Sequence, residues 1–103
     1  MKILISDSAF NDLEQIKEYY EGEGVPHIGE DFVFKIIGHI ETLIDNPEIG
    51  RIVPEFNTQK IRELIHNPFR IVYVKEMNSI HIVRVWRSER LMKLIDNSND
   101  NEI

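Results

Sequence analysis

The spacing of apolar residues changes near the middle of the chain, and this change restricts the possible folds. In the first half, Ala9, Leu13, Ile16 and Tyr20 recur at intervals of four, three and four, which is the spacing of an amphipathic helix. A similar stripe over residues 27–45 predicts a second helix, built on Ile28, Phe32, Ile36, Ile40 and Leu43 or Ile44. From Lys60 onward the pattern changes to three β-rich runs, residues 61–66, 69–75 and 80–87. The sequence therefore predicts a helical hairpin followed by an antiparallel meander.

The remaining segments complete the order of elements. Residues 2–5 are short and β-prone, and the following Ser6 and Asp7 suit a helix N-cap and an acidic first turn. Residues 47–58 lack a clean period and are predicted to form a loop. We therefore expect an α+β fold in the order β-α-α-β-β-β, with the helical hairpin packed on a mainly antiparallel four-stranded sheet.

Length and composition limit the kind of protein. The 103 residues suit one domain, which we place at residues 1–95, with a polar tail at 96–103. The absence of cysteine excludes disulfides and cysteine zinc sites and fits a reducing cytoplasm. No apolar run predicts a membrane span or a secretory signal.

Charge is distributed unevenly along the chain. Residues 1–50 carry 3 Lys and 11 acidic residues, whereas residues 51–95 carry 9 Lys plus Arg and 4 acidic residues. The basic half suits an acidic partner or a nucleic-acid backbone, although the net charge of −6 opposes tight nonspecific phosphate binding. Two solvated faces of opposite sign are the plainer interpretation.

The central strand of the predicted meander is apolar on both faces. Phe69, Ile71 and Tyr73 share one face, and Val72 and Val74 share the other with Arg70. Because a sheet covered on one side alternates apolar with polar residues, the second face also needs cover. The long loop, the C-terminal segment or a partner chain could supply it.

Motifs for common enzyme chemistry are absent. The sequence has no glycine-rich phosphate loop, no nucleophile-elbow serine and no histidines at metal-binding spacing, so we expect neither a metal nor a cofactor. Arginine stands out instead, since five of the six arginines lie on or just after the meander: Arg62, Arg70, Arg84, Arg87 and Arg90. Such a cluster could bind phosphates or an acidic peptide, and the alternative is cross-strand pairing with Glu63, Glu76 and Glu89.

The meander resembles the sheet of ParE/RelE-type toxins. The similar stretches are Ile61 to Leu64, Phe69 to Tyr73 and Ile80 to Arg90, preceded by Ser6 to Leu13, Tyr19-Tyr20 and Asn46 to Gly50. This resemblance implies the toxin of a bacterial type II toxin–antitoxin system, in a hetero-oligomer with an antitoxin whose C-terminal segment wraps the toxin. An antitoxin would also supply the cover that the second sheet face needs.

The family divides by target, and the resemblance implies different residue roles for each branch. In RelE-like enzymes, which cleave messenger RNA on the ribosome, Arg70 and either Arg87 or Arg90 would be catalytic. This chain lacks the terminal Tyr or His of that branch. In ParE-like inhibitors of DNA gyrase no catalytic residues are needed, and the run Arg84 to Arg87 is more similar to theirs. We therefore favour gyrase inhibition over RNA cleavage, with a non-toxic antitoxin-binding member as a third possibility. The expected target or partner contacts are Arg62, Val72, Val74, Arg84, Trp86, Arg87 and Arg90.

Overall fold

The predicted order of elements is confirmed, with one strand added. The computed structural model describes residues 1–88. It contains β1 (Lys2–Ile5), α1 (Asp7–Gly22), α2 (Pro26–Glu41), a 3-10 turn (Thr42–Ile44), β2 (Arg51–Ile52), β3 (Ile61–His66), β4 (Phe69–Lys75) and β5 (Ser79–Arg87). The sheet thus has five strands rather than the predicted four, because two residues of the expected loop pair with β3 as β2.

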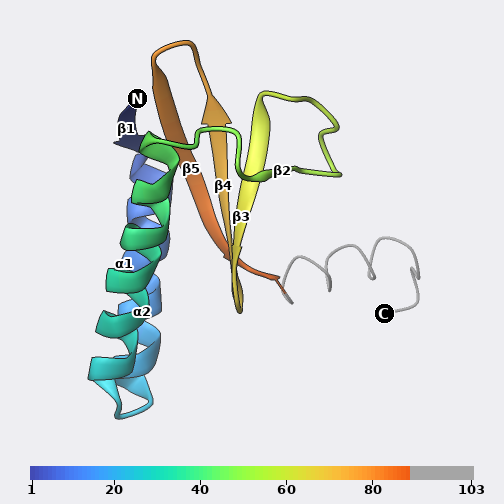
Figure 1. Ribbon diagram of the computed structural model, residues 1–103. Coiled ribbons are helices and arrows are strands. Elements are labelled where there is room, and N and C mark those ends of the chain that lie inside the picture. Colours follow the sequence, from blue (N-terminus) through green and yellow to red (C-terminus); the bar gives the residue numbers. More distant parts are fainter. Residues whose placement is uncertain (89–103) are drawn as a thin grey trace, which may run out of the picture.

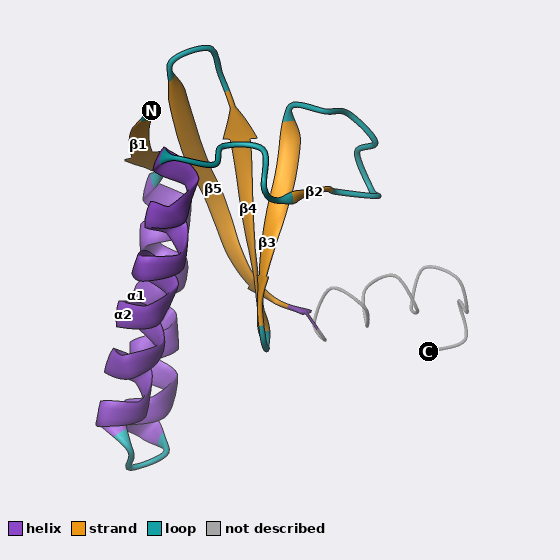
Figure 2. Ribbon diagram, viewed as in Figure 1, coloured by secondary structure: helices purple, strands orange, loops and turns teal. Residues whose placement is uncertain are grey.

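The sheet is mainly antiparallel, as predicted, and its strand order is β1-β5-β4-β3-β2. The first strand pairs in parallel with the start of β5, from Ser79 to Ile82. Beyond that point the outer edge of β5 has no strand partner within residues 1–88. The two helices form one layer on the sheet, and the loop that carries β2 lies at the opposite side of the molecule from them (Figures 1 and 2).

Local signals in the sequence explain the helix ends. The Ser6 hydroxyl accepts a hydrogen bond from Ala9 N at 3.0 Å, and it donates to the Val83 carbonyl of β5 at 3.1 Å. The N-cap predicted at Ser6 therefore also ties the start of α1 to the sheet. Gly24, at φ +80°, forms the turn after α1, and Pro26 starts α2 with its ring at the first helical position.

The core lies between the helices and one face of the sheet. Its strand residues include Phe69, Ile71 and Tyr73, which share a face as predicted. The helices contribute the buried residues Ala9, Leu13, Ile16, Ile36 and Ile40, and Leu43 follows from the 3-10 turn. The ambiguity between Leu43 and Ile44 is resolved, since Leu43 is buried and Ile44 is 43% exposed.

The short segment between the 3-10 turn and β2 is held by hydrogen bonds to Tyr73 of β4. Gly50 N donates to the Tyr73 hydroxyl at 3.0 Å, and that hydroxyl donates to the Pro47 carbonyl at 3.0 Å. A Cβ on Gly50 would lie 2.6 Å from the Tyr73 hydroxyl, so a larger residue does not fit there. Burial of the Tyr73 phenol raises its pKa, which keeps it neutral as a donor.

None of the helices in residues 1–88 is both long and apolar enough to span a bilayer. The proposed tail at 96–103, the last part of the proposed domain and the site residue Arg90 lie outside the described residues.

Candidate functional site

The arginines predicted to form a cluster lie in different environments. The residues that face each other across β4 and β5 include Phe69 with Arg87 and Arg70 with Trp86. Because Phe69 belongs to the helix-covered core, Arg87 lies on the helix side of the sheet and Arg70 on the other. The structure therefore does not bring Arg70 and Arg87, the two predicted catalytic arginines, to one face.

Arg70 is part of a buried ion-pair network on the face away from the helices. Its Nε donates to Glu63 Oε1 at 2.6 Å, and its terminal nitrogens contact Glu55 at 3.2 and 3.3 Å. The Glu63 side chain is fully buried and also accepts from Arg51 Nε at 2.6 Å. We call these four residues, Arg51, Glu55, Glu63 and Arg70, the loop-side network. It joins the loop to β3 and β4, so the guanidinium of Arg70 is already paired with two carboxylates.

Arg62 forms hydrogen bonds with backbone carbonyls. Its Nε donates to the Gln59 carbonyl at 3.0 Å, and a terminal nitrogen donates to the Gly50 carbonyl at 2.9 Å. These bonds tie Arg62 to the backbone on both sides of β2. Arg62 therefore stabilises the loop as the structure stands, whatever part it plays in partner binding.

Arg84 forms a second, more open carboxylate pair at the edge of β5. Its Nε and a terminal nitrogen donate to the two oxygens of Asp12 at 2.8 and 2.9 Å, a bidentate geometry. Asp12 Oδ2 also accepts from Val85 N at 2.9 Å, which satisfies a donor on the unpaired edge of β5. The hydrogen bond to Asp12 raises the pKa of Arg84 further above its ordinary value. We call Asp12 and Arg84 the edge pair.

A groove of about 350 Å³ lies beside the edge pair. Its lining includes Asp12, Tyr19, Phe69, Trp86 and Arg87. The cationic groups stack on its aromatic rings, with Arg84 Cζ 5.1 Å from the Trp86 ring centroid and Arg87 Cζ 5.6 Å from that of Phe69. The structure thus brings Trp86 and Arg87 together in the groove, with Arg84 stacked on Trp86. Strand pairing also sets Arg84 beside Val72 and Trp86 beside Arg70, so Arg84 and Trp86 border the face away from the helices as well.

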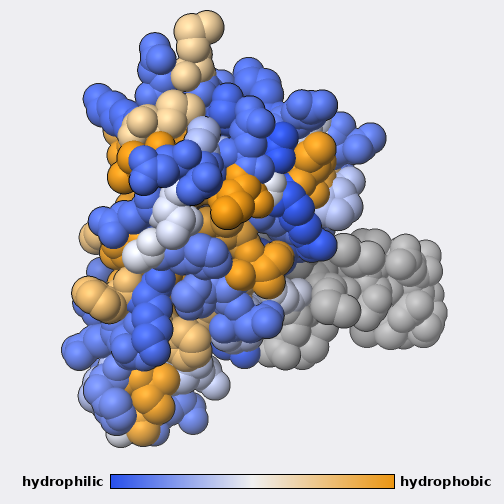
Figure 3. All heavy atoms as spheres, in the orientation of Figure 1, coloured by the Kyte–Doolittle hydropathy of each residue, from blue (hydrophilic) through white to orange (hydrophobic). Residues whose placement is uncertain are grey.

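Two further predicted contacts lie on the face away from the helices. Val72 is buried, with 3% of its surface exposed, whereas Val74 is half-buried. On the same face of β3, Ile61 pairs with Val74 and is half-buried, and Ile65 is exposed. Figure 3 shows apolar patches between the two helices and the loop that carries β2, and others over the helices themselves.

Several site residues were not predicted because they are distant in sequence from their partners. Asp12 lies 72 residues before Arg84, and Glu55 lies in a loop without a repeating pattern. Glu63 was considered as a cross-strand partner, and the structure confirms that role. An acidic residue on the buried stripe of a predicted helix, as Asp12 is, was the one available signal.

Comparison with known proteins agrees with the fold. Residues 3–92 match the family described as "ParE toxin of type II toxin-antitoxin system, parDE". The chain therefore belongs to the ParE toxin family of type II toxin–antitoxin systems. No curated protein matches the sequence.

Two solved structures share the fold at low sequence identity. A chain from the chromosomal ParDE system of P. aeruginosa is similar with a TM-score of 0.72 and 23% identity, covering 84% of this chain and 95% of that one. The YoeB dimer from Staphylococcus aureus gives a TM-score of 0.56 and 21% identity, covering 84% of this chain and 94% of that one.

Proposed function

We propose that this ParE-family toxin acts by binding DNA gyrase in the cytoplasm and is neutralised by a cognate antitoxin. The observation that carries the proposal is the groove at the edge of β5, where Trp86 and Arg87 lie beside the edge pair. Aromatic and arginine side chains around a partly apolar hollow are the groups that contribute most to protein–protein binding.

The position of Arg70 supports binding over catalysis. Metal-independent RNA cleavage needs cations that can reach the phosphate and a base and an acid placed around it. The side chain of Arg70 is 8% exposed and paired with two carboxylates, and Arg87 lies on the opposite face of the sheet. A phosphate contacting both arginines would require the loop-side network to open.

Antitoxin binding is assigned to the other face of the sheet. Val74 and its cross-strand partner Ile61 are half-buried there and Ile65 is exposed, so this face carries an incompletely covered apolar surface, as the sequence pattern indicated. A partner segment lying on β3 and β4 would bury this surface, and the expected assembly is a hetero-oligomer. Amide hydrogen exchange of β3 and β4 should slow when the antitoxin is added; unchanged exchange would place the antitoxin elsewhere.

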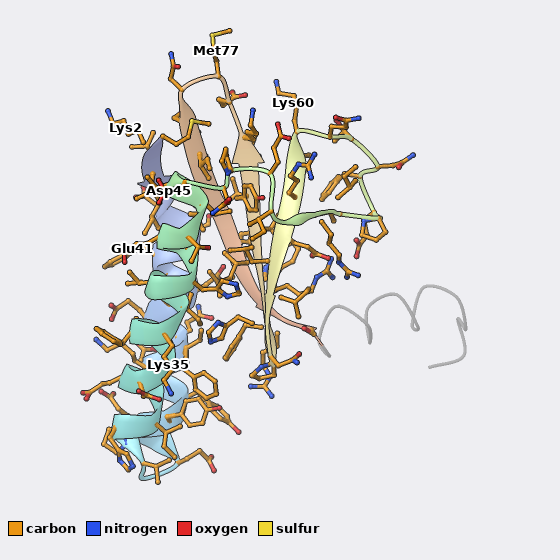
Figure 4. All side chains as sticks on the ribbon, in the orientation of Figure 1. Lys2, Lys35, Glu41, Asp45, Lys60 and Met77 are labelled. Atoms are coloured by element: carbon orange, nitrogen blue, oxygen red, sulfur yellow. The ribbon has the colours of Figure 1, made fainter. Side chains whose placement is uncertain are left out.

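A supercoiling assay tests the proposed target. The purified chain should inhibit ATP-dependent supercoiling of relaxed plasmid by gyrase. The Arg87→Glu variant should be at least about tenfold less potent, because it reverses a charge in the groove. Lys60→Glu is the matched control, since Lys60 is an exposed cation at the far end of β3 (Figure 4), and it should retain potency.

Incorporation of labelled precursors distinguishes the targets in cells. After induction without antitoxin, incorporation of labelled thymidine should fall before that of labelled methionine. An earlier fall of methionine incorporation would overturn the proposal in favour of ribosome-dependent RNA cleavage. If neither falls while the chain is soluble, the chain is a non-toxic member that only binds antitoxin.

A further inference from the structure

Two histidines far apart in the sequence meet between α2 and the end of β3. His39 Nδ1 and His66 Nδ1 are 3.0 Å apart, although 27 residues separate them. Both side chains are half-buried, and their ring centroids are 5.2 Å apart. This contact lies on the helix side of the sheet and includes no residue assigned to gyrase or antitoxin binding.

We propose that His39 and His66 form a binding site for a divalent transition-metal ion of the zinc class, with both Nδ1 atoms as ligands. The neutral imidazole nitrogen is a preferred ligand of such ions, with metal–nitrogen distances of about 2.0–2.1 Å. Tetrahedral geometry at those distances separates the two nitrogens by about 3.3 Å. At 3.0 Å the two nitrogens share a hydrogen bond, so one Nδ1 carries a proton in the metal-free chain. When the metal binds, that Nδ1 proton is released to solvent, the ring keeps or takes its proton on Nε2, and the nitrogens separate by a few tenths of an ångström.

The scaffold holds the two ligands before any ion binds. His39 is in the last turns of α2, and His66 is the last residue of β3, where it pairs with Phe69 of β4. Both elements pack on the same core, in which Ile36 and Ile40 flank His39 and Phe69 is buried. Little conformational freedom is therefore lost when a metal bridges the two rings, and the metal would crosslink the hairpin to the sheet.

The surrounding charges permit a cation. The hydrogen bond between the two Nδ1 atoms requires a lone pair on at least one ring, and an unprotonated imidazole nitrogen is the form that binds a metal. The Lys35 ammonium opposes a metal, but it lies 3.0 Å from Asp31 on the same helix, which offsets its charge. Lys35 lies on α2 (Figure 4), and it precedes His39 in that helix by four residues, about one turn.

The remaining coordination positions would be open. No group of three or more His, Cys, Asp or Glu residues within residues 1–88 is placed to hold a metal, so this part of the chain supplies two ligands. A hollow beside His66, lined by His27, Asp31 and Phe32 among others, gives water access to that ring. A two-ligand site with bound water is weaker than a closed structural zinc site and would exchange its metal.

Calorimetry on the full chain, prepared without a histidine tag, tests the proposal. Titration with ZnCl2 at pH 7.5 should give one zinc ion per chain, and MgCl2 should give no binding because Mg²⁺ prefers oxygen ligands. His39→Asn and His66→Asn should each weaken zinc binding at least about tenfold, since an amide replaces the Nδ1 ligand and can still form the hydrogen bond. His81→Asn is the matched control, because His81 is half-buried on β5 beside Ser79, and it should bind zinc normally.

Two further measurements use the natural chain, so they can be made even if a histidine variant folds poorly. At a zinc concentration 100 times the Kd, the unfolding temperature of the natural chain should rise by about 10 °C. The 15N signals of the His39 and His66 rings should shift on zinc addition, and those of His81 should not. Absence of zinc binding at millimolar concentration, or unchanged affinity in the double variant His39→Asn/His66→Asn, would overturn the proposal.

Discussion

The loop-side network and the edge pair use the same chemistry in different surroundings. In each, a carboxylate accepts hydrogen bonds from arginine nitrogens, with donor–acceptor distances of 2.6 to 2.9 Å. The Glu63 side chain is fully buried and that of Arg70 is 8% exposed, whereas the Arg84 side chain is 40% exposed at the rim of a groove. Burial therefore separates an arginine that holds the fold together from one that a partner can reach.

The largest expected effect is that of removing Arg70. Arg70→Ala would leave the buried Glu63 carboxylate with Arg51 alone, and loss of one partner from a buried ion pair costs about 3–5 kcal/mol. Urea unfolding measures this change in the free energy of unfolding. The double variant Glu63→Leu/Arg70→Met should recover most of the stability, because it removes both charges. If Arg70→Ala costs less than Arg84→Ala, the contrast between the two sites is wrong.

Removal of the edge carboxylate should have an intermediate effect. Asp12→Ala leaves the Val85 N–H and the Arg84 guanidinium without their acceptor, and we expect a loss of about 1–3 kcal/mol. Solvent can replace part of the bond to Arg84, so the loss should be smaller than for Arg70. The same variant should weaken gyrase inhibition, because Asp12 positions Arg84 against Trp86. Full potency at reduced stability would restrict Asp12 to a structural role.

Substitution of Arg51 tests whether, within the loop-side network too, a more exposed arginine contributes less to stability. Its side chain is 60% exposed although it bonds to the buried Glu63. We expect Arg51→Ala to cost about 1 kcal/mol or less, since Arg70 continues to neutralise Glu63. Chemical unfolding in parallel with Arg70→Ala gives the comparison. A cost equal to that of Arg70→Ala would show that the network acts as a unit.

The smallest effect concerns pH and the contact between His39 of α2 and His66 of β3. The folded pKa of His66 lies below its ordinary value of 6.5, because burial and His39 disfavour the charged ring. The unfolded chain therefore binds a proton more readily, so stability is full above pH 6.5 and declines as the pH falls through the folded pKa. In metal-free buffer, thermal unfolding from pH 7.5 to 5.5 should show a smaller decline for His66→Asn than for the natural chain.

Local patterns were sufficient to predict most of the secondary structure. The spacing of Ala9, Leu13 and Ile16 predicted α1, and the β-rich runs predicted β3, β4 and β5 within one residue of their ends. The N-cap at Ser6 was predicted for the same reason, since a capping bond joins residues three apart. The two-residue strand β2 was not predicted, because its backbone bonds to β3 stabilise it and no periodicity marks it.

The family could be predicted from the order of short motifs in the sequence. The placement of the arginines on different faces of the sheet could not. An arginine's partner depends on strand register, and a shift of one residue would exchange the two faces of β4. Folding placed Arg70 between Glu63 and Glu55, Arg84 on Asp12, and His39 against His66. Composition and local spacing determined which types of residue are present and which elements they form. Long-range packing determined which of these residues contact one another. Each contact joins segments far apart in the chain, and no local pattern marks such a pair.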